Sequence, residues 1–204
     1  ERVDRHRVGE VPMRLGAAAL LTFASAPMPN STLLGRPTGG DFESPDGERF
    51  TRDIVRSPGA VGVVPLFLDG GEPNVVLVRQ YRAPFDEYVL EVPAGMRDIA
   101  DEPTEVTAAR ELVEEAGIEP GTLTFLTEYY PAAGMTDSRL HLYLATDLRR
   151  VERDTHGPEE AYMDVVELPL ARAVAMVMSG EIRDGKTIIG LLMAERMWRE
   201  GAFA

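Results

Sequence analysis

One stretch constrains this chain more than any other: residues 93–118, which read PAGMRDIADEPTEVTAARELVEEAGI. Apolar residues recur at helical spacing over residues 103–116, and Gly117 stands where a left-handed residue would end a helix. At 100° per residue one face of this helix gathers apolar side chains, which we expect to meet the core: Val106, Ala109, Leu112, Val113 and Ala116.

The opposite face of the predicted helix carries three acids, Glu111, Glu114 and Glu115. One interpretation is an ordinary solvated surface. However, carboxylates three and four residues apart repel each other by a few tenths of a kcal/mol, and the last turn is the negative end of the helix dipole. A bound cation would relieve both effects, and oxygen ligands on one helix face suit Mg²⁺. The helix alone leaves both interpretations open.

The charge balance limits the partners of the chain. A formal charge of −13 and a pI near 4.7 oppose binding to nucleic acid or to an anionic membrane, because both need clustered Lys and Arg. With no cysteine, thiolate nucleophiles, disulfides and Cys-type zinc sites are excluded. The three histidines are scattered, so a bound metal should be a hard ion held by oxygen: Mg²⁺, Mn²⁺ or Ca²⁺.

The length of 204 residues and a hydrophobic content of 44% predict one main domain with an appended arm. Residues 1–40 contain a Pro-, Gly- and Ser-rich linker, so we place a boundary near Gly40 and the main domain at 41–204. Residues 14–27 look like a signal peptide, but a short helix or strand is the favoured interpretation. No run reaches the roughly 18 apolar residues of a membrane span, and we expect a cytoplasmic protein.

The order of predicted elements indicates an α/β fold. Apolar, β-branched runs bounded by turn signals predict strands within residues 59–82, 87–95, 123–131, 138–148 and 163–170. Ala-, Met- and Leu-rich segments at helical spacing predict two further helices over residues 171–180 and 186–200. The expected architecture is a mixed sheet flanked by helices.

Gly95, Glu102 and RELVEEAGI (residues 110–118) resemble the Nudix box, G-x5-E-x7-R-E-U-x-E-E-x-G-U, where U is aliphatic. From Glu102 onward the match is complete. Six residues rather than five separate Gly95 from Glu102, and we expect this insertion to lengthen a loop and leave the helix unaltered.

The resemblance implies an α/β/α sandwich that hydrolyses a nucleoside diphosphate linked to another group. It implies Glu111 and Glu115 as the main metal ligands and Glu114 as a further ligand or a water-positioning acid. The backbone carbonyl of Ala94 would complete a site for Mg²⁺, or Mn²⁺, with more than one ion. Arg110 and Glu102 would be structural, with Arg110 orienting the acids.

Segments outside the box, VRQYR (78–82), LEVPAG (90–95), SGEIRDGKTIIGLL (179–192) and Pro131, resemble the ADP-ribose pyrophosphatase branch. The resemblance covers roughly residues 41–200. It implies hydrolysis of ADP-ribose to AMP and ribose 5-phosphate, by a homodimer with contacts from the N-terminal region.

The same resemblance suggests substrate-binding and catalytic residues. Arg82 matches a substrate-contacting arginine, and its guanidinium could clamp a diphosphate with paired hydrogen bonds. A loop glutamate that orients water in this branch corresponds to Glu159 or Glu160, with Glu160 favoured by its spacing to the following strand. Weaker candidates for substrate contact are Arg79, Glu91, Arg52 and Arg56.

Three alternatives remain at this stage. The substrate could be another nucleotide sugar such as GDP-mannose, or the chain could sense ADP-ribose without turnover, although intact Glu111, Glu114 and Glu115 oppose a sensor. GEIRDGKT (180–187) also fits the P-loop pattern, but an Ala- and Met-rich helical run precedes it instead of a buried strand. We therefore expect Gly180 and Gly185 to shape a turn between two helices.

Overall fold

The computed structural model describes residues 37–68, 71–153 and 163–203. Its centre is a seven-stranded sheet in the order β11-β4-β3-β9-β8, with β5 on β4 and β6 on β3. The strands are β3 (Ala60–Phe67), β4 (Asn74–Arg82), β5 (Glu87–Glu91), β6 (Ala94–Met96), β8 (Thr122–Tyr129), β9 (Leu140–Thr146) and β11 (Asp164–Pro169). Since β3 and β9 run parallel and the other pairs antiparallel, the predicted mixed sheet is confirmed.

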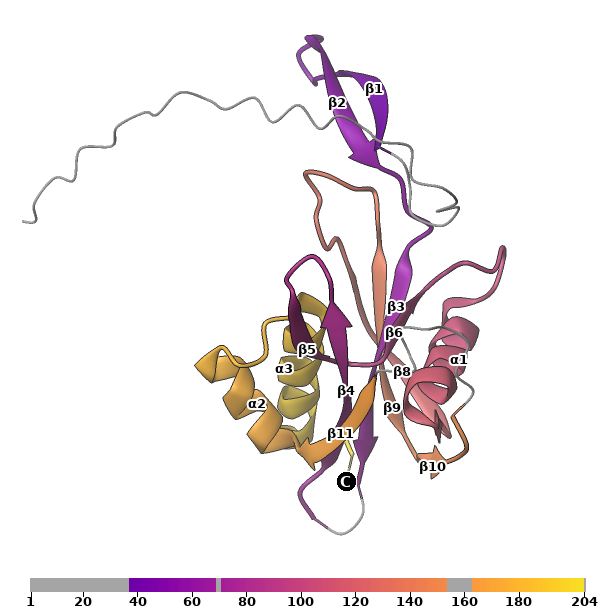
Figure 1. Cartoon of the computed structure of the whole chain (residues 1–204), viewed down its shortest axis with the longest axis vertical. Helices are drawn as coiled ribbons and strands as arrows, with labels where there is room; N and C mark the ends of the chain where they lie inside the picture. The colour runs from indigo at the N-terminus through magenta and orange to yellow at the C-terminus, as the bar shows by residue number, and fades with distance from the viewer. Residues whose placement is uncertain (1–36, 69–70, 154–162, 204) are drawn as a thin grey trace, which may run out of the picture. The chain divides into compact units, whose positions relative to one another are not determined.

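Helices cover both faces of this sheet, as Figure 1 shows. Because side chains alternate along a strand, β3 sends Val64 and Leu66 to one face and Val61 and Val63 to the other. The first pair packs under α2 (Leu170–Ser179) and α3 (Gly185–Arg199), and the second under α1 (Thr104–Ala116). The described residues thus form three layers, which confirms the expected α/β fold with a mixed sheet flanked by helices.

The predicted helix ends are also present. Gly117 ends α1 with φ 64°, and a Cβ there would lie 2.8 Å from the Val151 carbonyl oxygen, so glycine is required. Gly180 ends α2 in the left-handed region, and Asp184 caps α3 by accepting a hydrogen bond from the Thr187 N–H. Residues 180–184 therefore join α2 to α3, and Gly185, which we expected to shape the turn, is the first residue of α3; this arrangement excludes a P-loop.

The predicted orientation of α1 is wrong at its edges. Val106, assigned to the core face, is 51% exposed, whereas Glu111 and Glu115, assigned to the face opposite the core, are only 8% and 7% exposed. The helix packs against β3 and β4 and also against β6, the short strand paired with β3, and β6 covers the carboxylates. The buried face is consequently rotated toward Glu111 and Glu115.

Smaller elements complete the described chain. β1 (Pro37–Glu43) and β2 (Arg49–Val55) form an antiparallel hairpin, and β7 (Ile118–Glu119) pairs with β10 (Arg149–Arg150). Gly40 lies within β1, and the domain boundary expected near it stays a prediction. The interpretations of residues 1–36 concern a segment outside the described residues and stay predictions too.

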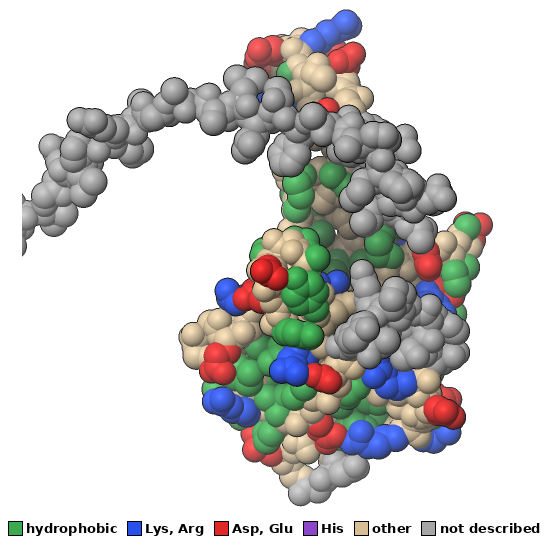
Figure 2. Space-filling view, in the orientation of Figure 1, with side chains coloured by type: hydrophobic (Ala, Val, Ile, Leu, Met, Phe, Trp, Pro, Cys, Tyr) green, Lys and Arg blue, Asp and Glu red, His purple; other side chains and the backbone are tan. Residues whose placement is uncertain are grey.

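The surface carries mixed charge. Figure 2 shows acidic side chains interspersed with Lys and Arg on the face that it draws. Across residues 37–68, 71–153 and 163–203, no helix combines the length and apolar character that a membrane crossing requires.

Candidate active site

The site is built where α1 meets the backbone of β6. Glu115 Oε2 accepts a hydrogen bond from the Ala94 N–H at 2.8 Å. A Cβ added to Gly95 would lie 2.0 Å from Cδ of Glu111, so only glycine lets this carboxylate keep its position. Because β6 pairs with β3 in the register Val61↔Gly95 and Gly62↔Ala94, the sheet fixes the backbone against which both acids lie.

Arg110 holds the acids of the helix together. Its Nη1 lies 2.9 Å from Glu111 Oε1 and 3.0 Å from Glu114 Oε2, and its Nη2 lies 3.4 Å from Glu102 Oε2. Glu102 also accepts a 2.7 Å hydrogen bond from the Thr107 hydroxyl, which ties the preceding loop to the first turns of α1. This geometry agrees with the supporting roles expected for Arg110 and Glu102.

The additional residue between Gly95 and Glu102 lies in the loop that precedes α1. Asp101 adopts φ 61° there, and the Glu102 N–H donates to the Ile99 carbonyl at 3.3 Å. The helix still begins at Thr104, and Glu111 and Glu115 still reach β6. The chain thus accommodates the additional residue in this loop while both carboxylates contact β6.

Burial makes ionisation of the two inner acids unfavourable. It raises the pKa of Glu111 to about 7, although the charge of Arg110 opposes the change, and raises the pKa of Glu115 to about 8 against the hydrogen bond from Ala94. Two neighbouring buried carboxylates are stabilised in their charged form by a cation.

The donor set fits Mg²⁺ better than an ion that needs a full protein cage. No three carboxylate or imidazole side chains of the described residues already converge as a complete ligand set. Mg²⁺ needs only one or two carboxylates because it retains several waters and binds substrate phosphates. Glu111 and Glu115, both oxygen donors beside the Ala94 backbone, meet that requirement.

A second charged group lies at the ends of β4 and β5. Arg82 donates from Nε to Glu91 Oε1 at 2.5 Å and from Nη2 to Glu91 Oε2 at 2.8 Å. Glu91 is 3% exposed, and Lys186 of α3 contacts the same Oε2. Burial opposes the ionisation of Glu91, but the hydrogen bonds from Arg82 and the charge of Lys186 outweigh it and hold the pKa of Glu91 below its usual range.

Lys186 was not singled out from the sequence as a site residue. Glu91 and Lys186 are 95 positions apart, so no local spacing links them. The available signal was a lysine in the first turn of an apolar helix, two residues after an N-capping aspartate.

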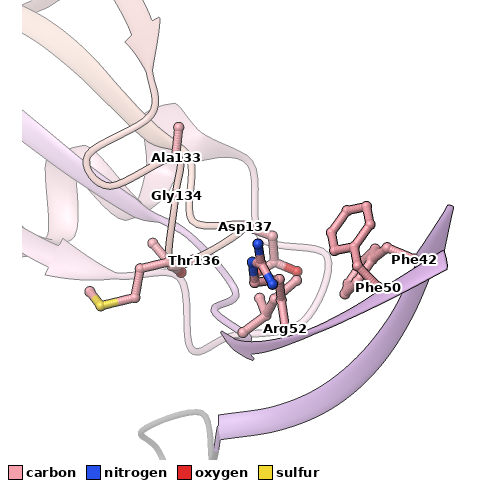
Figure 3. A pocket seen from close by; sticks show the side chains of 9 residues that line it. Phe42, Phe50, Arg52, Ala133, Gly134, Thr136 and Asp137 are labelled. Carbon is pink, nitrogen blue, oxygen red and sulfur yellow. The ribbon is translucent and has the colours of Figure 1, made fainter. Parts of the chain in front are cut away.

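The other predicted substrate residues lie elsewhere. Arg79 pairs with Asp164 at 2.5 Å and lies over the ring of Tyr88. Arg56 pairs with Asp137 at 2.8 Å. Arg52 lines a cavity of about 380 Å³ together with Phe42, Phe50, Ile54 and residues 133–137 (Figure 3). Glu159 and Glu160 lie outside the described residues.

Comparison with known proteins gives a consistent result. Residues 56–183 match the family model described as "NUDIX domain". An ADP-ribose pyrophosphatase of Mycobacterium tuberculosis is 40% identical over 148 residues, 72% of this chain and 70% of that protein. A methanol dehydrogenase activator of Bacillus methanolicus is 36% identical over 151 residues, 74% of this chain and 80% of that protein.

Two further matches extend this result. A GDP-mannose pyrophosphatase of Salmonella typhimurium is 37% identical over 160 residues, covering 69% of this chain and 82% of that protein. The crystal structure of an ADP compounds hydrolase superposes with a TM-score of 0.71 at 26% identity, covering 86% of this chain and 91% of the other.

Proposed function

The chain belongs to the Nudix hydrolase family, and from this premise we propose that it hydrolyses the diphosphate bond of ADP-ribose to give AMP and ribose 5-phosphate. The observation that carries the proposal is the pair of buried carboxylates, Glu111 and Glu115, packed on Ala94 and Gly95. The ADP-ribose pyrophosphatase of M. tuberculosis supports the choice of substrate.

Glu111 and Glu115 would hold Mg²⁺ or Mn²⁺, with Glu114 and the Ala94 carbonyl as further ligands and more than one ion per site. When bound, the metal neutralises charge on the diphosphate and lowers the pKa of its water. Arg110 keeps Glu111 and Glu114 in one arrangement through its contacts with both, and the Ala94 N–H holds Glu115. The protein thereby supplies a fixed set of acids before substrate arrives.

Arg82 is suited to bind the diphosphate. Its Nε and Nη2 face Glu91, and Nη1 makes no hydrogen bond to any residue in the described part of the chain. A planar guanidinium has a second edge, formed by Nη1 and Nη2, that can donate hydrogen bonds to a phosphate while the Nε and Nη2 edge stays paired with Glu91. Glu91 thus orients Arg82, and Arg82 binds substrate.

The reaction adds one water across the phosphorus–oxygen–phosphorus bridge. The water oxygen forms a bond to one phosphorus, the bridging bond breaks, and the displaced phosphate leaves as part of AMP or of ribose 5-phosphate. Glu160 or Glu159, or Glu114, would orient the water and accept its proton. Water attack at a diphosphate depends mainly on positioning and charge stabilisation, so the proton acceptor need only be aligned.

The nucleoside end of the substrate has a candidate site in the cavity of Figure 3. Phe42 and Phe50 stack with ring centroids 5.8 Å apart, and the Arg52 guanidinium lies 5.1 Å from the centroid of the Phe50 ring. Aromatic rings and guanidinium planes are surfaces on which a purine stacks. We assign Arg52 and Arg56 to this end, in a cytoplasmic homodimer to which the N-terminal region contributes.

GDP-mannose is the second candidate substrate, because the Salmonella relative is named for it. A panel of ADP-ribose, GDP-mannose, NADH, diadenosine polyphosphates and 8-oxo-dGTP, each with Mg²⁺ or Mn²⁺ and read by chromatography, separates them. Preferred turnover of ADP-ribose supports the proposal. Preferred turnover of another compound would make that compound the substrate instead of ADP-ribose. Binding of ADP-ribose with no turnover of any compound would identify a sensor.

A further inference from the structure

Lys186 is the most deeply buried cation near the site. The residue is 8% exposed, and its stem crosses β3 at Gly62, where an added Cβ would lie 3.7 Å from Lys186 Cδ. Gly62 pairs with Ala94 in the sheet, so Lys186 reaches the site from the face of the sheet opposite α1. Burying a lysine is costly unless its ammonium is paired.

The ammonium of Lys186 contacts two carboxylates. Its Nζ reaches Oε2 of Glu91 and lies 3.1 Å from Oδ1 of Asp184. Oε2 of Glu91 is also the oxygen that accepts from Nη2 of Arg82 at 2.8 Å. One carboxylate oxygen of Glu91 therefore contacts both the buried Lys186 and Arg82, the arginine proposed to bind the diphosphate.

The first turn of α3 fixes the backbone at the same place. The Thr187 hydroxyl accepts a 2.8 Å hydrogen bond from the Val92 N–H and donates to Asp184 Oδ2 at 2.6 Å. Thr187 is fully buried. The helix start thus holds the main chain after Glu91 through Thr187 and the side chain of Glu91 through Lys186.

We propose that Lys186 is a positioning residue for phosphate binding, which acts through Glu91 to keep the Nη1 edge of Arg82 turned toward the substrate. This inference rests on the proposed role of Arg82 in binding a diphosphate. Without Lys186, Arg82 is the one cation of the described residues that still pairs with Glu91, and the carboxylate turns further onto the guanidinium. The arginine is then less available to a phosphate.

The test is a double-mutant cycle on Lys186→Met and Glu91→Gln, read as the affinity for ADP by calorimetry in metal-free buffer and as KM and kcat in turnover. Methionine keeps the length of the stem over Gly62 and removes the charge. Each single variant should weaken ADP binding and raise KM by about tenfold, consistent with partial loss of charge-assisted hydrogen bonds, with kcat within about threefold. The double variant should match the singles, because both act on one path.

A loss of about a hundredfold in the double variant, or an unchanged KM and ADP affinity in Lys186→Met, would overturn the proposal. If Lys186→Met does not fold, Glu91→Gln is compared with the double variant: equal ADP affinities support the proposal, and a weaker double variant contradicts it. Arg196→Met is the matched control, because Arg196 is an exposed cation at the far end of α3 that pairs with Glu200. The measurement of ADP binding needs no turnover. If the enzyme does not hydrolyse ADP-ribose, the proposed substrate is wrong, but the ADP affinities of the double-mutant cycle still test the role of Lys186.

Discussion

A Cβ on Gly95 would lie 2.0 Å from Cδ of Glu111, so the backbone of β6 and a carboxylate of α1 share one small space. In Gly95→Ala the carboxylate must move away. Because it ends a flexible side chain, we expect a stability loss of only about 1 kcal/mol but a fall in activity of at least about tenfold. Thermal unfolding and Mg²⁺-dependent turnover measure the two effects. Wild-type activity at wild-type Mg²⁺ concentrations would show that Glu111 does not need this position.

Metal removal should expose the cost of the buried acids. The pKa of Glu111 is raised to about 7 and that of Glu115 to about 8, mainly by burial. Because each pKa is higher in the folded protein than in the unfolded chain, the protonated acid stabilises the fold. This contribution is fully present below the unfolded pKa near 4.5 and is lost as the pH rises through the folded values of about 7 and about 8. In chelator the melting temperature should therefore fall from pH 6 to pH 9, and Mg²⁺ should restore it most at the alkaline end. An equal effect of Mg²⁺ at pH 6 and pH 9 would contradict this linkage.

Glu91 should behave in the opposite sense. Its pKa is held below the usual value of 4.5, since hydrogen bonds from Arg82 and the charge of Lys186 outweigh the effect of burial. A lowered folded pKa gives stability that is present above about 4.5 and is lost as pH falls through the folded value. Glu91→Gln should cost about 3 kcal/mol at pH 7 and flatten the acid limb of the melting curve plotted against pH. If the melting temperature of Glu91→Gln falls with acid pH as steeply as that of the wild type, groups other than Glu91 cause the acid unfolding.

Arg82→Lys should raise KM with little change in kcat. A single ammonium cannot pair with Glu91 and present a second planar edge to a diphosphate, so we expect a loss of about 10- to 100-fold in affinity. Arg79→Lys is the comparison, because Arg79 is already engaged with Asp164 and Tyr88. Steady-state kinetics measures KM for both variants. A larger rise in KM for Arg79→Lys than for Arg82→Lys would assign diphosphate binding to Arg79 instead of Arg82.

Much of the fold could be predicted from local patterns. The apolar runs of β3 and β9, the helical spacing of α1, α2 and α3, and the glycines at 117 and 180 each carry their own signal. The acids of the site could also be named, because Glu111, Glu114 and Glu115 lie within one short motif.

The environment of those acids could not be predicted. A helical wheel shows which residues share a face but not which neighbours cover it, so the packing of β6 on Glu111 and Glu115 had no local signal. The bond between Lys186 and Glu91 joins elements 95 positions apart and depends on how α3 lies across the sheet. Burial and long-range ion pairs follow from tertiary packing.

The central claim is that Glu115 carries metal-dependent hydrolysis of ADP-ribose, and its most direct test compares the wild type with Glu115→Gln. With Mg²⁺ and ADP-ribose, the wild type should release AMP and ribose 5-phosphate in equal amounts, and the variant should be slower by at least about a hundredfold. Removing a buried acid whose pKa is raised to about 8 should leave the fold intact, with a metal-free melting temperature at pH 9 no lower than that of the wild type. A folded Glu115→Gln protein that hydrolyses ADP-ribose at the wild-type rate would contradict the account.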